Sequence, residues 1–421
     1  MKTRRKIFLM LAPTFCYQLF EYRAIPVVVL KMSGFLMSFL LFILSLKQIF
    51  LKHYKAFSIP WLLRAIIIQT LFTFIIAALF WNQPFPNTFR SSICFFNLSF
   101  FFLLLKYKAE RNFILKLVLA YTVIEIILLF YAFSAAPIRV FGLLGEDGEA
   151  YISDERGGYR LSIAGKTIAA IAYFYFLGKA FVKEKRERLV CIAISILLLI
   201  FNCSSLTRSN MASIFVVTVY VIYCHTKNKI KFLALLACSI IAITFIFQYF
   251  FQEQYETMLD LTETQFSYSG GKDIMSWSYR IYEYIFFFTE YNQSVFTYIL
   301  GNGMPNNSPL QDYEDFWKMH GYWASDVSYA MIFKALGLVG LILYITLIVK
   351  ALRLKVSKEN RFCKSYILYA AVSTITISNL LDSIPLCACL YLIYKDNKGM
   401  LKVQSKHEVS HELDIRKNDV I

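Results

Sequence analysis

The chain has 421 residues, of which 58% are hydrophobic and 17% aromatic, and it carries a formal net charge of +16. A soluble domain cannot bury so much apolar surface, so the composition excludes an ordinary soluble enzyme and favours a membrane protein. Hydrocarbon about 30 Å thick needs roughly 20 apolar residues per helix, and runs near that length recur throughout. Because lipid offers no partner for a free backbone N–H or C=O, we expect these runs to be helices.

The sequence predicts an all-α membrane bundle of about twelve transmembrane helices. The first run resembles a signal-peptide core, but no small-x-small cleavage site follows it, so we expect it to be retained as a span. The expected spans lie near residues 7–20, 25–46, 61–80, 91–105, 112–133, 161–181, 189–203, 210–225, 232–251, 326–349, 365–380 and 383–394.

These spans divide the chain into four parts. We expect an N-terminal transmembrane bundle over 1–251, a large extracytoplasmic loop with short helices over 252–325, three further spans over 326–395, and a polar cytoplasmic tail over 396–421. The long outer loop directs the search for function to the non-cytoplasmic side.

The basic residues predict the orientation. Of the 44 Lys and Arg residues, 30 fall in the termini and in the segments after every second span, nine fall in the other connections, and five lie within spans. The positive-inside rule then puts both termini in the cytoplasm. Because topology accounts for the positive charge, we expect no nucleic-acid partner.

The scattered cysteines and the lack of an internal repeat argue against some functions. Nine cysteines are scattered among the helices and none lies in 252–325, so neither a disulfide framework nor a metal site is predicted. The two halves of the chain do not mirror each other, which argues against a secondary transporter.

Three arginines are expected on the outer side. Arg160 stands at the mouth of span six, Arg208 lies in a tight turn of small polar residues, and Arg280 lies in an aromatic-rich loop helix. Gathered together, they would bind phosphate, because a guanidinium donates two parallel hydrogen bonds and stays charged. The alternative is that each arginine reaches lipid headgroups. For Arg208, held in its short turn, we favour the binding role.

Two residues near the start of span ten are candidate bases. Asp326 either caps the helix and complements its dipole, or accepts a proton from a hydroxyl nucleophile. His320, six residues upstream, is the second candidate.

Aromatic residues of the outer loop have two possible roles. They either stack on sugar faces or form a belt at the membrane interface. The candidates for glycan binding are Trp277, Tyr279, Trp317 and Trp323.

Spans five and ten also contain residues with other expected roles. Lys334 lies two turns inside it, and Glu125 is mid-membrane in span five. Buried ionisable groups need a partner or a wet cavity, and a Glu125–Lys pair is one option. Gly337 and Gly340 are expected to let another helix approach closely.

The topology and three short motifs resemble the O-antigen polymerase and O-antigen ligase superfamily. Arg160-Leu-Ser-Ile-Ala-Gly165 is similar to the family's Arg-x-x-Gly type segment, and Leu206-Thr-Arg-Ser-Asn210 is similar to its Thr-x-Ser-Arg-like turn. Asp326-Val327, nine residues and Gly337-x-x-Gly340 match the spacing of the ligase motif His-(Asn/Ser/Gln)-x9-Gly-x-x-(Gly/Thr/Tyr). Asp replaces the His here, which favours a polymerase, although the polymerases' paired Arg-x10-Gly repeats are not present in clean form.

The resemblance implies a metal-independent glycosyltransferase of the bacterial cytoplasmic (inner) membrane, with no cofactor. It would polymerise repeat units linked to undecaprenyl pyrophosphate, for O-antigen, capsule or exopolysaccharide. The partners implied are the lipid-linked oligosaccharide, membrane lipids and a chain-length regulator protein. The three arginines would hold the pyrophosphate, and Asp326 or His320 would accept the proton. A ligase that transfers finished glycan to a lipid or protein, and a lipid-linked oligosaccharide flippase, remain alternatives.

Overall fold

The computed structural model describes residues 3–136, 138–141, 165, 167–203, 208–230, 234, 277–377 and 379–418. Within these residues the chain is helical, apart from turns and an isolated bridge between Tyr22 and Phe141, so the all-α class is confirmed there. The elements in chain order are α1 (Thr3–Cys16), η1 (Gln18–Glu21), α2 (Val27–Leu46), η2 (Lys47–Leu51), α3 (Ile59–Trp81), α4 (Phe85–Ser91), α5 (Ile93–Phe96), α6 (Ser99–Tyr107), α7 (Arg111–Ala135), α8 (Thr167–Ala180), α9 (Lys185–Cys203), α10 (Arg208–His225), α13 (Trp277–Thr289), α14 (Val295–Leu300), α15 (Pro309–Met319), η3 (Ala324–Asp326), α16 (Ser328–Arg353), η4 (Lys358–Asn360), α17 (Arg361–Ser373), η5 (Asn379–Leu381) and α18 (Ser383–Asn418).

Four helices in the described part are long and apolar enough to cross a membrane. They are α2 with η2, α3, α7 and α16, and the bent pair Phe85–Ser91 and Ile93–Tyr107 makes a fifth if it counts as one span. The other expected spans correspond to shorter or more charged helices, while 232–251 falls outside the described residues. The apolar helices give the chain the character of a membrane protein.

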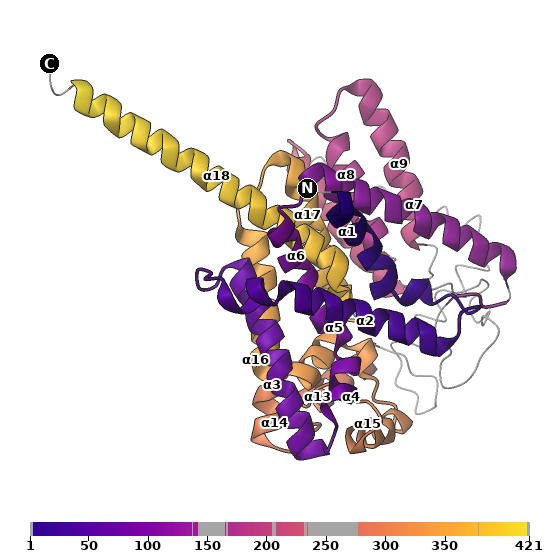
Figure 1. The fold of residues 1–421 in the computed structure, drawn as a ribbon. Helices are drawn as coiled ribbons and strands as arrows, with labels where there is room; N and C mark the ends of the chain where they lie inside the picture. Colours follow the sequence, from indigo (N-terminus) through magenta and orange to yellow (C-terminus); the bar gives the residue numbers. More distant parts are fainter. Residues whose placement is uncertain are drawn as a thin grey trace.

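The helices form two groups with a hairpin between them (Figure 1). In one group α14 packs against both α3 and α16, and α13 packs against α16. In the other α8 packs against α7, α9 and α17. The last part of α18 projects from the molecule.

Helices α17 and α18 form a hairpin, and α17 is short compared with the long apolar helices around it. The 13 residues of α17 extend only about 20 Å, which is less than the hydrocarbon thickness. Its connection to α18 lies inside the bundle, since Thr374, Asn379 and Ser383 are all buried. A buried connection must satisfy its polar groups with other parts of the protein, and this one does so with several helices.

Helix α16 is interrupted at Gly337, whose φ of 69° and ψ of −173° are not helical. The backbone of residues 299–301 runs against this break, and a Cβ on Gly337 would lie 2.3 Å from the Ile299 carbonyl oxygen. The close approach of another helix expected at Gly337 is therefore made, by the C-terminal end of α14 and the Gly301 that follows it. Gly340 packs against Leu336 of its own helix.

The carbonyl groups released by this break are satisfied from two sides. The backbone N–H groups of Asn302 and Gly303 donate to the carbonyls of Lys334 (2.9 Å) and Ala335 (3.0 Å). The Gln69 side chain of α3 donates to the Leu336 carbonyl at 3.0 Å. The interruption is thus built into the fold, because the unwound backbone has partners away from water.

Candidate functional site

The first candidate site is a half-buried carboxylate, that of Asp382, in the α17–α18 connection. The Tyr17 hydroxyl donates to Asp382 Oδ1 at 2.8 Å, and the Thr167 hydroxyl donates to Asp382 Oδ2. Tyr17 follows α1 and Thr167 begins α8, so one carboxylate links three parts of the chain. Glu125 of α7 lies near enough to act electrostatically on Tyr17. We call Tyr17, Thr167 and Asp382 the Asp382 cluster.

A polar network continues from the Asp382 cluster towards α10. Tyr369 of α17 donates its hydroxyl to Asn210, and the amide of Asn379 donates to Tyr369 at 3.3 Å and to Ser373 at 2.8 Å. The start of α10 is therefore fixed against the C-terminal half of α17.

Segments next to two of the predicted arginines meet at this connection. Gly165 closes the motif that begins at Arg160, and a Cβ there would lie 2.8 Å from the Tyr17 ring. Its φ of +92° also favours glycine. Asn210 closes the motif that contains Arg208. The two motifs are at least 41 residues apart in sequence, yet Asn210 contacts Tyr369 and Asn379 directly, and Gly165 packs on Tyr17, which binds Asp382.

The second candidate site contains the buried carboxylate of Glu283. Glu283 of α13 is 1% exposed, and its Oε1 accepts the Trp323 backbone N–H at 2.8 Å. The charges of Arg280 and Asp326 act on it. Its Oε2 is buried and has no hydrogen-bond partner within the described part of the chain. We call Arg280, Glu283, Trp323 and Asp326 the Glu283 cluster.

Burial raises the pKa of Glu283 to about 7. The Trp323 N–H and the charge of Arg280 lower this pKa, whereas the charge of Asp326 raises it further. A carboxyl group with such a pKa is partly ionised near neutral pH, which suits a group that accepts and returns protons.

The Glu283 cluster is anchored to α17 by hydroxyl groups. Tyr284 of α13 donates to the Ile375 carbonyl at 2.8 Å, and Tyr329 of α16 donates to the Ala371 carbonyl at 2.9 Å. One short segment, 369–382, therefore contains Asp382 and is contacted both by α10 and by α13.

An aromatic cluster joins α13, α15 and the segment that follows α15. The Trp317 ring lies 4.5 Å from Phe286 and 5.8 Å from Tyr322, measured between centroids, and Phe286 stacks on Tyr322 at 4.1 Å. Trp317 is thus packed among other rings. The exposed His320 lies at the end of α15, where its Nδ1 is 2.8 Å from the Phe316 carbonyl oxygen.

Lys334 forms a buried ion pair with an unexpected partner. Its Nζ lies 2.6 Å from Glu314 Oε1 of α15, and the two side chains are 2% and 13% exposed. The pair adjoins the break in α16, since the Lys334 carbonyl is the one that Asn302 binds. It therefore fastens α15 to the interrupted helix.

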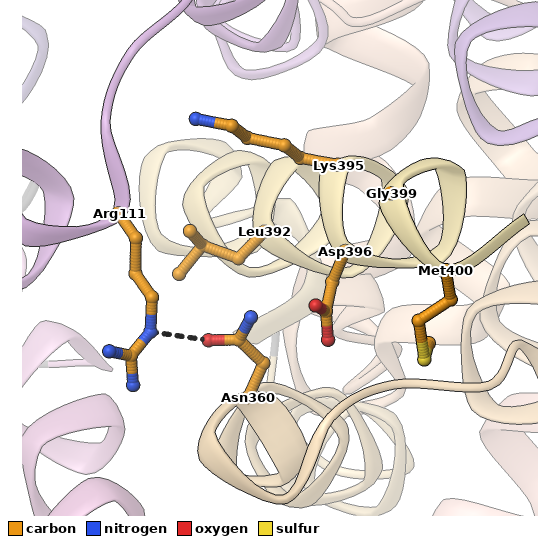
Figure 2. A pocket seen from close by; sticks show the side chains of 7 residues that line it. All are labelled: Arg111, Asn360, Leu392, Lys395, Asp396, Gly399 and Met400. Atoms are coloured by element: carbon orange, nitrogen blue, oxygen red, sulfur yellow. Dashed lines mark hydrogen bonds between the residues drawn. The ribbon is translucent and has the colours of Figure 1, made fainter. Parts of the chain in front are cut away.

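A pocket of about 570 Å³ opens at the other end of the hairpin (Figure 2). Arg111 donates to Asn360 Oδ1 at 2.9 Å and forms an ion pair with Glu359 at 2.9 Å, while Lys395 donates to the Ala109 carbonyl at 2.8 Å. The basic groups of this pocket hold α7, η4 and α18 together. The remaining lining residues are Leu392, Asp396, Gly399 and Met400.

The structure describes only some of the predicted site residues. Arg160 falls outside the described residues, as do the side chains of Arg208, Trp277 and Tyr279. Arg280 and Asp326 are half-buried and belong to one cluster. His320 lies apart, beside the aromatic cluster.

The structure bears on one of the two roles expected for Asp326, that of a helix cap. Asp326 ends η3, and the N-cap of α16 is Val327, with no side-chain hydrogen bond to the cap. The expected helix cap is therefore not formed. Its charge instead acts on Glu283.

Sequence reasoning missed the residues at the centre of both clusters. Glu283 is the one acidic residue of α13, so its place in an aromatic, half-apolar helix was a usable signal. Asp382 stands between two apolar runs, but its hydroxyl partners are 365 and 215 residues away, and nothing local predicts them.

Fold and site together define a helical membrane protein in which several helices close around a polar connection. No protein-family model, no curated protein and no solved structure matches the chain.

Proposed function

We propose that this protein polymerises lipid-linked oligosaccharide repeat units in the assembly of a surface polysaccharide. The growing glycan passes from undecaprenyl pyrophosphate to a sugar hydroxyl of a second lipid-linked unit. The observation that carries the proposal concerns residues 369–382. Segments adjoining Arg208 and Arg280 contact them directly, and the end of the Arg160 motif reaches Asp382 through Tyr17.

The proposal includes the full topology. The shorter helices α1, α8, α9, α10, α17 and α18 enter or cross the bacterial cytoplasmic membrane together with the four long ones, and both termini lie in the cytoplasm. The charge pattern supports this orientation, because α17 begins with Arg361 and Lys364 whereas its other end is free of Lys and Arg. Residues 369–382 then lie towards the outer face, where lipid-linked glycans are displayed.

The chemistry of the transfer suits guanidinium groups and needs no other cation. In the reaction the bond from the anomeric carbon to the diphosphate oxygen breaks, and negative charge develops on the leaving diphosphate. Arg160, Arg208 and Arg280 hold and neutralise that diphosphate. Trp277, Tyr279, Trp317 and Trp323 hold the glycan near the membrane surface.

The direct test is deletion of the gene, followed by analysis of glycan chain length. We expect single repeat units in place of long chains, and restoration of long chains by a plasmid copy. Unchanged chain lengths in the deletion strain would refute the proposal. A ligase would leave long chains unattached, and a flippase would leave repeat units facing the cytoplasm.

A point substitution refines the test. Arg208→Ala is expected to abolish polymerisation while the protein is still made and inserted, because the diphosphate loses one of its charged donors. Arg186→Ala is the matched control, since Arg186 is exposed at the other end of α9 and should retain long chains. Wild-type chain lengths from Arg208→Ala would remove Arg208 from the site.

A further inference from the structure

Glu283 is the most deeply buried carboxylate of the described outer segment, and one of its oxygens has no hydrogen-bond partner there. Oε1 is held by the Trp323 N–H, which fixes the carboxyl group against η3. Oε2 has no hydrogen-bond partner in the described residues. A buried acceptor without a partner is costly, so such atoms in a folded protein mark a place where water or a ligand group binds.

The two expected bases fit the role less well. His320 is exposed at the end of α15, its Nδ1 faces the Phe316 carbonyl, and its ring lies against Phe316 at 4.4 Å between centroids. Asp326 is half-buried, beside the Ser325 hydroxyl at 3.4 Å. The Glu283 cluster lies at the protein surface, because Trp323 is 46% exposed.

We propose that Glu283 accepts the proton of the attacking sugar hydroxyl, with Asp326 as the charge that tunes its basicity. This inference rests on the proposed polymerase function. In the step, the acceptor O–H bond breaks and its proton passes to Glu283, directly or through one water. The freed oxygen bonds to the anomeric carbon, and undecaprenyl diphosphate leaves with the electron pair, held by the arginines. The proton then returns to solvent.

The pKa of Glu283, raised to about 7 by burial, agrees with this role. A base works best when its pKa is near the working pH, because it is then both ionised and able to hold a proton. The proximity of Arg280 is consistent as well, since one helix turn separates the base from a residue proposed to bind the leaving diphosphate.

The test uses the full-length protein in nanodiscs, with lipid-linked repeat units extracted from the deletion strain as substrate. Chain growth is followed on gels from pH 5 to pH 9. Glu283→Gln keeps an oxygen that accepts the Trp323 N–H, but it cannot take a proton. We expect it to slow transfer about 100-fold and to remove the rise in rate that wild-type protein shows near pH 7. Glu290→Gln makes the same change at an exposed position of the same segment and should stay within about twofold of wild type.

Asp326→Asn keeps the inference testable if Glu283→Gln fails to fold. Loss of the negative charge lowers the pKa of Glu283, so the rise in rate should move to lower pH while activity persists. If Asp326 itself were the base, Asp326→Asn would abolish transfer and Glu283→Gln would keep the pH-dependent rise.

The outcomes separate the two proposals. Wild-type protein that never extends the repeat units overturns the polymerase function. Wild-type extension together with an unchanged rate and pH profile in Glu283→Gln overturns the role of Glu283 alone.

Discussion

The carboxylates of Asp382, in the α17–α18 connection, and of Glu283, on α13, differ in how completely their oxygens are hydrogen-bonded. Each oxygen of Asp382 accepts a hydroxyl hydrogen bond, from Tyr17 and from Thr167. Glu283 has one oxygen bound and one without a described partner, and charges of both signs act on it. A saturated carboxylate holds helices together, whereas an unsaturated one can exchange a proton or bind a ligand. Hydrogen-bond satisfaction thus separates Asp382, which we regard as a framework residue, from Glu283, which we propose to be reactive.

The largest effect on stability is expected at the Lys334–Glu314 pair. Like the Asp382 cluster it holds parts of the fold together, but it consists of two full charges that are buried. Lys334→Met leaves Glu314 buried without its counter-charge, so we expect a loss of about 4 kcal/mol in unfolding free energy. Thermal unfolding in detergent, calibrated by chemical denaturation, measures it. Lys318→Met is the control, since it breaks a pair with Asp315 whose side chains are 24% and 39% exposed, and it should have little effect. Equal losses from both variants would mean that burial does not determine the strength of these pairs.

The framework role of Asp382 gives the next largest effect. Asp382→Ala leaves the hydroxyls of Tyr17 and Thr167 without their acceptor, so we expect a loss of about 3 kcal/mol in unfolding free energy. The same unfolding assay applies, with Asp312→Ala as control because Asp312 is exposed on α15. A stable Asp382→Ala protein that has lost only glycan transfer would break the comparison and move Asp382 into the reactive class.

The Glu283 cluster predicts a smaller effect that depends on pH. The pKa of Glu283 is raised from 4.5 to about 7 in the folded protein, so the folded state binds the proton more tightly than the unfolded state. Its stabilisation is therefore complete below about pH 4.5 and is lost as the pH rises through about 7, with a change on the order of 2 kcal/mol. Unfolding temperatures across this range should fall for wild type. The fall should be smaller for Glu283→Gln, and parallel curves would show that Glu283 is an ordinary surface acid.

The sequence predicted what depends on local patterns. The four long apolar helices, the helical character of 277–289 and the close approach at Gly337 all follow from hydrophobic runs and small residues. The role of Asp326 as a neighbour of Glu283 was not predicted, because it depends on the packing of η3 against α13.

Partners distant in sequence account for most of what could not be predicted. The sequence left the partner of Lys334 unassigned, with a Glu125–Lys pair as one option; Lys334 pairs with Glu314, which precedes it by 20 residues on a separate helix. Charge type alone does not choose between two glutamates, and the fold of α15 onto α16 decides it. The hydrogen bonds to both oxygens of Asp382 similarly depend on long-range packing, which brings Tyr17 after α1 and Thr167 at the start of α8 next to it.

The interruption of α16 has a consequence for biosynthesis. The carbonyl groups that the interruption leaves without helical partners accept hydrogen bonds from Gln69, Asn302 and Gly303. All three residues precede Lys334 in the chain. Each partner has therefore left the ribosome before the interrupted helix emerges. Because of this order of synthesis, the hydrogen-bond donors for the interrupted backbone are already present when α16 is made. The helix therefore need not enter the bilayer with unpaired carbonyl groups.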